Sequence, residues 1–210
     1  MTRTKSQQNE VVGTCHEYGL MIDTREIFLH PIFDVFESED AGTDYRMANK
    51  FIKNMRILES INHNQIIVHQ YNIGGDWNAG MAIYDAIKNS VCNIIFICHG
   101  IASSMGSIIP QAADVRITMP NCDWLVHEGS TDIGDMTYRQ SRSWSQWEEV
   151  AYEKMMEIYT NATNVKRRTF KTMFSRKEDW WLSSEEAVKR GFADAIYGTE
   201  GYESIESLKT

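Results

Sequence analysis

Residues 91–98 (VCNIIFIC) form a run that is apolar at almost every position. A strand with one face in water alternates apolar and polar side chains, whereas a strand covered on both faces of a sheet is apolar throughout. Further short apolar runs predict strands at residues 26–29, 65–71, 115–119 and 124–126. The sequence therefore predicts a sheet whose central strand is buried on both sides.

Segments with the period of amphipathic helices lie between these strands. The helices predicted from this period span residues 44–58, 79–88 and 136–159, and another begins near Ser103. Residues 183–186 have the form of an N-terminal capping box, and Gly191 is placed to end the helix that follows. Alternation of strands and helices predicts an α/β fold built from βαβ units.

The size and charge of the chain limit its function. Its 210 residues fit one domain, and no Ser/Gly-rich linker divides them. A net charge of -8 argues against a nucleic-acid partner, since phosphate binding needs a basic surface. The basic run at residues 166–168 is interpreted as a solvated helix face. The polar N-terminus lacks the apolar stretch of an export signal, and no apolar run is long enough to span a membrane.

The cysteines show neither a CxxC spacing nor a regular framework; they are Cys15, Cys92, Cys98 and Cys122. We interpret them as reduced, mostly buried thiols, which indicates a reducing compartment and a cytoplasmic protein. The histidines are scattered rather than clustered, so no metal site is predicted.

Two loops, at residues 72–76 and 100–107, each follow a predicted strand and open a predicted helix. Glycines there let backbone N–H groups face a ligand, and a helix N-terminus adds unpaired donors. Together the loops could form an oxyanion hole beside a serine. A serine nucleophile also needs a base. His127 and His99 both end predicted strands, and position alone leaves the choice between them open.

Four motifs, in this order along the chain, resemble those of the Clp protease proteolytic subunit (ClpP) family. Residues 73–75 and the helix after them resemble the family's Ser-Pro-Gly-Gly loop. Residues 100–106 resemble its serine motif, Gly-x-Ala-Ala-Ser-Met-Gly. Residues 119–127 resemble the strand leading to the catalytic histidine, and residues 179–194 resemble the segment with the catalytic aspartate. The resemblance covers nearly the whole chain.

The resemblance implies a serine endopeptidase with the triad Ser104, His127 and Asp179, in which Ser104 rather than Ser103 or Ser107 is the nucleophile. The backbone N–H groups of Gly75 and Met105 would form the oxyanion hole, with no metal or other cofactor. The implied fold is ClpP/crotonase-like, with stacked ββα repeats and a protruding handle helix that carries Trp144 and Trp147.

The resemblance also implies an assembly. Two stacked seven-membered rings of identical subunits would enclose a chamber, and a partner ATPase, an AAA+ unfoldase, would feed unfolded protein and peptides into it. The implied division is an N-terminal segment at residues 1–17, expected as a flexible axial region, a peptidase domain at 18–198 and a tail at 199–210.

The chain departs from the family pattern at four places. Asn72 and Ile73 replace Ser-Pro, and Asp76 adds a charge after the glycines. Residues 128–135 differ from the family's usual Gly-rich, Gln-containing segment, and residues 33–42 form an extra stretch. Three alternatives stay open. A non-catalytic ring subunit would normally have lost a triad residue. A crotonase-type acyl-CoA enzyme would use the same paired backbone donors without needing the triad, and a Ser–Lys peptidase would use a base other than His127.

Overall fold

The computed structural model describes residues 4–29, 42–130 and 134–208. The helices are α1 (Lys5–Tyr18), α2 (Tyr45–Ile61), α3 (Trp77–Lys88), α4 (Met105–Ile108), α5 (Tyr138–Ala162), α6 (Arg167–Ser175), α7 (Ser184–Arg190) and α8 (Ile205–Leu208), with a 3₁₀ helix (Ile109–Ala112) after α4. The strands are β1 (Leu20–Met21), β2 (Glu26–Leu29), β3 (Ile66–Asn72), β4 (Ile94–Ser103), β5 (Val115–Thr118), β6 (Asp123–Val126), β7 (Trp180–Leu182) and β8 (Ala195–Ile196). Apart from Gly42, the extra stretch at residues 33–42 lies outside the described residues.

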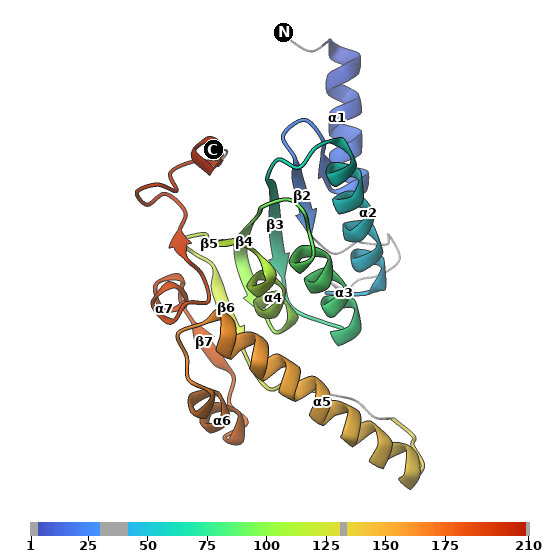
Figure 1. The fold of residues 1–210 in the computed structure, drawn as a ribbon, viewed down its shortest axis with the longest axis vertical. Coiled ribbons are helices and arrows are strands. Elements are labelled where there is room, and N and C mark those ends of the chain that lie inside the picture. Colours follow the sequence, from blue (N-terminus) through green and yellow to red (C-terminus); the bar gives the residue numbers. More distant parts are fainter. Residues whose placement is uncertain (1–3, 30–41, 131–133, 209–210) are drawn as a thin grey trace.

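These strands form one mixed sheet. They pair in the order β1-β2-β3-β4-β5-β8, and β6 branches from this path by pairing with both β4 and β7. The β1–β2 and β6–β7 pairs are antiparallel, and the other pairs are parallel. Parallel neighbours need a crossover between them, and the helices α2 and α3 provide it for β2, β3 and β4 (Figure 1). The predicted α/β fold is confirmed.

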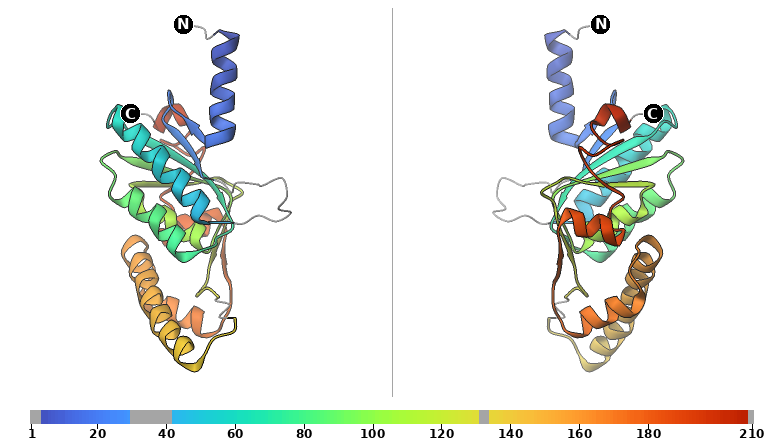
Figure 2. Two further views of the ribbon diagram at one scale, coloured as in Figure 1. Left: turned by 90° about the vertical axis from the view of Figure 1, so that its right-hand side faces the viewer. Right: turned by 90° about the vertical axis from the view of Figure 1, so that its left-hand side faces the viewer.

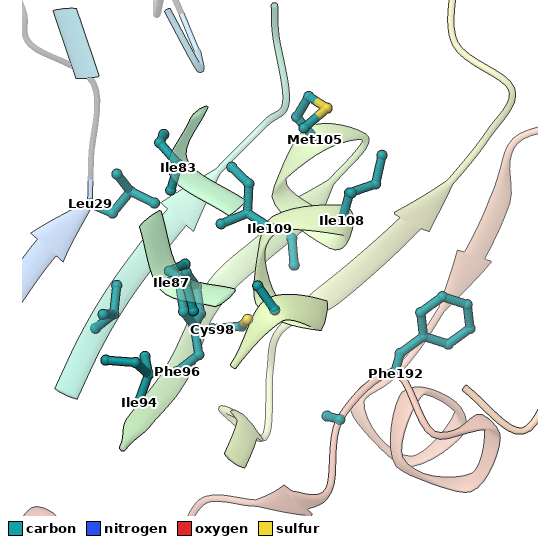
Figure 3. Packing of buried hydrophobic residues seen from close by; sticks show 14 of the residues in the cluster. Leu29, Ile83, Ile87, Ile94, Phe96, Cys98, Met105, Ile108, Ile109 and Phe192 are labelled. Atoms are coloured by element: carbon teal, nitrogen blue, oxygen red, sulfur yellow. The ribbon is translucent and has the colours of Figure 1, made fainter. Parts of the chain in front are cut away.

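The central strand β4 is covered on both faces, as its apolar run predicts. Ile94 and Phe96 lie in the larger core cluster, together with residues of α2, α3 and α4. Ile95 and Ile97 point to the opposite face, where Leu208 of α8 helps to cover them. Figure 3 shows side chains from β4, α3 and the α4 segment meeting in the larger cluster.

The helix α7 begins and ends where the sequence predicts. The Ser183 hydroxyl accepts a hydrogen bond from the Glu186 N–H, and Gly191 ends the helix with a left-handed φ of 80°. The reciprocal bond of a complete capping box is not formed, because the Glu186 side chain pairs with Arg190 instead. The cap is therefore half of the predicted motif.

The helix α5 extends away from the sheet, as expected of a handle (Figures 1 and 2). It starts at a complete capping box formed by Thr137 and Gln140, which the sequence reasoning did not identify. Its buried residues lie in the C-terminal third, whereas Trp144 and Trp147 remain 37% and 41% exposed. The two tryptophans therefore do not pack into the core of their own subunit.

The strand β4 is longer than predicted, and this corrects the position of His99. The apolar run ends at Cys98, but the strand does not. Residues 95–98 of β4 pair with β5, and residues 101–103 of the same strand pair with β6. His99 therefore lies within β4 rather than after it. For the same reason, the helix expected from Ser103 begins at Met105.

The helix α1 was not predicted, because residues 5–18 are mostly polar and lack a strong apolar stripe. It projects from the end of the chain's fold opposite to α5 (Figures 1 and 2). None of the helices in the described part of the chain is both long and apolar enough to cross a membrane.

The four cysteines are free thiols. Three of them are buried and Cys15 is partly exposed, so the prediction of mostly buried thiols is confirmed. Within residues 4–29, 42–130 and 134–208, no three His, Cys, Asp or Glu side chains gather in an arrangement that could hold a metal ion.

Candidate active site

Ser104 occupies a sharp turn between β4 and α4. Its backbone angles, φ 54° and ψ -119°, lie in a region that residues other than glycine rarely adopt. The Ser104 N–H holds this conformation by donating to the Leu125 carbonyl of β6 at 3.0 Å. Strained turns of this kind expose a serine hydroxyl at the end of a strand.

His127 reaches this hydroxyl because β6 pairs with β4. The parallel register places Leu125 beside Ser103, so the residues that follow the two strands are neighbours. The Nε2 atom of His127 lies 2.8 Å from the Ser104 Oγ atom, which is a normal hydrogen-bond distance. Position along the sequence alone did not distinguish this histidine from His99.

Asp179 meets the other side of the imidazole through the antiparallel β6–β7 pair. Val126 pairs with Trp180, and one step further along this register His127 faces Asp179. The Nδ1 atom of His127 lies 3.6 Å from the Asp179 Oδ1 atom. This is an ion-pair distance, slightly longer than a hydrogen bond, and such contacts often tighten only when substrate binds.

The rival base, His99, belongs to a different cluster. Its Nε2 atom lies 3.1 Å from His69 Nδ1, and His69 Nε2 lies 3.2 Å from a Glu26 carboxylate oxygen. Burial, helped by the neighbouring His69, lowers the pKa of His99 to about 4. The structure therefore brings His127 to Ser104 and directs His99 toward His69.

The glycine loop lies directly against the serine. A Cβ atom on residue 74 would come within 2.6 Å of the Ser104 Cβ atom, so only glycine fits there. Thr43 forms a parallel bridge with Gly75 by bonding to the backbone on either side of it, which directs the Gly75 N–H away from Thr43. Met105 is the first residue of α4, where an N–H has no acceptor within its own helix.

Two polar residues beside this loop make contacts that the sequence did not indicate. Thr43 showed no signal, because its partner Asn72 lies 29 positions away along the chain. Asp76 adds a charge after the glycines, as noted from the sequence. Its carboxylate caps α3 by accepting a hydrogen bond from the Ala79 N–H at 2.7 Å.

The arrangement has the parts needed for acyl transfer. A hydroxyl contacts an imidazole that can accept its proton, and a carboxylate lies on the far side of that imidazole. The glycine loop lies against Ser104 and α4 begins at the next residue, so both segments bring backbone N–H groups next to the serine. Backbone donors beside a nucleophile are the kind of group that can stabilise the negative charge of an attacked carbonyl oxygen.

The chain is similar to known proteins in both sequence and fold. The sequence profile of the family described as Clp protease matches residues 15–200. An ATP-dependent Clp protease proteolytic subunit from Deinococcus radiodurans is 31% identical over 156 residues, which cover 72% of this chain and 74% of that protein. Subunit 2 from Pseudomonas aeruginosa is 30% identical over 163 residues, 76% of this chain and 79% of that one. The solved structure of a ClpP1 mutant from Listeria monocytogenes has the same fold, with a TM-score of 0.74 at 23% identity over 90% of this chain and 96% of that one.

Proposed function

This chain belongs to the Clp protease family, and we propose that it is a serine endopeptidase subunit that cleaves peptides and unfolded proteins. Residues 18–198 would form the peptidase domain, with residues 1–17 and 199–210 as flanking segments. The observation that carries the proposal is the 2.8 Å contact between His127 Nε2 and Ser104 Oγ.

In the proposed reaction, Ser104 Oγ attacks the peptide carbonyl while His127 Nε2 takes the hydroxyl proton. Asp179 orients the imidazole and stabilises its charged form. The N–H groups of Gly75 and Met105 bind the oxyanion of the tetrahedral intermediate. His127 then donates the proton to the leaving amine, and water releases the acyl group from Ser104 by the same steps in reverse order. No metal or other cofactor takes part.

A fluorophosphonate probe tests the nucleophile. The Ser104 oxygen should form a bond to phosphorus as fluoride leaves, so peptide mapping should find the label on Ser104. Heat-denatured protein and the Ser104→Ala variant should stay unlabelled, because labelling requires the assembled site. Absence of label on the native protein would contradict the proposal and favour a non-catalytic ring subunit or an acyl-CoA enzyme.

We further propose that the subunits form two stacked heptameric rings that enclose the active sites. The handle α5 leaves Trp144, Trp147 and Val150 exposed in the single subunit, and association would remove this surface from water. An AAA+ unfoldase would supply unfolded substrate. The free thiols suit a reducing compartment, and we propose the cytoplasm.

Assembly and access can be tested together. Native mass spectrometry should find a fourteen-subunit particle that hydrolyses a short fluorogenic peptide but leaves a folded protein intact. The double variant Trp144→Glu, Trp147→Glu should break this particle into smaller species, because it places charges in the proposed contact. Val91→Glu, a change at an exposed apolar residue away from α5, is the matched control and should keep the particle. A monomer that digests folded protein would contradict the enclosed chamber.

A further inference from the structure

Two buried polar side chains, Asn72 and Thr43, lie behind the glycine loop. Their exposed fractions are 0% and 1%. The Thr43 Oγ1 atom lies 3.0 Å from Asn72 Nδ2 and 3.1 Å from Asn72 Oδ1. The hydroxyl is therefore within hydrogen-bond distance of both polar atoms of the amide. Buried polar groups are costly unless they are paired, and this pair satisfies itself without solvent.

The pair is bonded to the backbone of the loop on both sides of Gly75. Asn72 Oδ1 accepts a hydrogen bond from the Gly74 N–H at 2.9 Å. The Thr43 N–H donates to the Gly74 carbonyl at 2.6 Å, and the Thr43 carbonyl accepts from the Asp76 N–H at 2.8 Å. The residues before and after Gly75 are therefore held, while its own N–H is directed to the other side of the strand.

The second proposed oxyanion donor is fixed against the same residue. A Cβ atom on Gly106, the residue after Met105, would lie 2.5 Å from the Asn72 carbonyl oxygen. The α4 turn thus packs directly on the backbone of Asn72. The register of β3 and β4 also pairs Asn72 with Ala102, just before the serine turn. Both donors are therefore positioned relative to the end of β3.

We propose that Thr43 and Asn72 are positioning residues that align the Gly75 N–H with the oxyanion. This inference rests on the proposed peptidase function. Two adjacent glycines have more backbone freedom than any other pair of residues, so a loop built from them needs outside support to hold a donor in place. An oxyanion donor contributes only when it points at the developing charge, and small displacements sharply reduce its effect.

Thr43→Val tests the proposal, because valine keeps the shape of threonine and lacks its hydroxyl. The rate constant kcat for a short peptide should fall by about tenfold or more, while KM changes little, since the oxyanion forms only after substrate binds. The affinity for a peptide aldehyde, which forms a tetrahedral adduct with Ser104, should fall by the same factor as kcat/KM. Thr43→Ser restores the hydroxyl and should recover most of the activity.

Thr118→Val is the matched control. Thr118 is also fully buried, and its hydroxyl accepts a hydrogen bond from the Trp124 indole N–H at 3.0 Å, away from the glycine loop. This variant should lose stability, measured as a lower unfolding temperature, and keep the wild-type kcat and aldehyde affinity. If Thr43→Val does not fold, Thr43→Ala, which leaves room for a water, takes its place with the same expected results.

Three results would overturn the proposal. Thr43→Val could behave like Thr118→Val, destabilised but with unchanged kcat, which would make the pair merely structural. Thr43→Ser could fail to recover activity, which would show that the hydroxyl does not have the proposed role. A wild-type protein that neither hydrolyses peptides nor binds the aldehyde would instead contradict the peptidase function itself, and this inference with it.

Discussion

Ser104→Ala should abolish peptide hydrolysis, with kcat lowered on the order of 10⁴-fold or more relative to the wild type. The change removes one oxygen atom, so packing against Gly74 and the Leu125 hydrogen bond to the backbone remain. Single-turnover assays on a fluorogenic peptide measure the loss. Native mass spectrometry should show the wild-type assembly, which would separate a chemical defect from a structural one.

The neighbouring serines are the controls for this variant. Ser103 lies in β4, and Ser103→Ala should keep most of the activity. Ser107 donates to the Ser104 carbonyl at 2.8 Å and contacts the Tyr159 hydroxyl at 2.7 Å, so Ser107→Ala should cause a partial loss. If either control abolished hydrolysis while Ser104→Ala kept it, the assignment of the nucleophile would be wrong.

His127→Ala should lower kcat by a factor similar to that of Ser104→Ala, because a hydroxyl without a base is a weak nucleophile. His99→Gln should retain most of the wild-type activity, since His99 contacts His69 rather than Ser104. Glutamine keeps a polar group that can bond to the His69 ring. Steady-state kinetics of the two variants, compared under one set of conditions, measure the difference.

The dependence of the rate on pH makes the same distinction. A general base must be unprotonated, so wild-type hydrolysis should fall in acid. Burial and His69 hold the pKa of His99 at about 4, so His99 remains neutral between about pH 5 and pH 8. His99→Gln should therefore leave the shape of the profile unchanged over that range. Equal losses in the two histidine variants, or a profile altered by His99→Gln, would contradict the choice of His127.

Patterns among consecutive residues predicted most of the fold. The strand expected at residues 26–29 coincides with β2, and the helix expected at residues 79–88 lies within α3. These predictions succeeded because the buried, apolar positions of a helix or strand recur in the local sequence with the period of that element. The same reasoning missed α1, whose 14 residues have little apolar character, and it ended β4 too early, at Cys98. Neither α1 nor the last residues of β4 carry a local apolar pattern that would indicate them.

Some parts of the candidate site were predicted from the sequence, and others became evident only in the structure. Through their resemblance to the family, the sequence motifs predicted Ser104, His127 and Asp179, and they placed glycines where backbone donors could face a ligand. Position along the chain alone left His99 as a rival base, and nothing in the sequence indicated that Thr43 bonds to the loop. Each of these depends on contacts between residues far apart in the chain.

Only the tertiary structure shows the contacts that separate His127 from His99. The strand β6 lies between β4 and β7, and its two registers place His127 beside Ser104 on one side and beside Asp179 on the other. Ser104 and His127 are 23 positions apart in the chain and 2.8 Å apart in space. Local propensity determines whether a segment becomes a strand, whereas strand order and register depend on side-chain packing across the whole sheet.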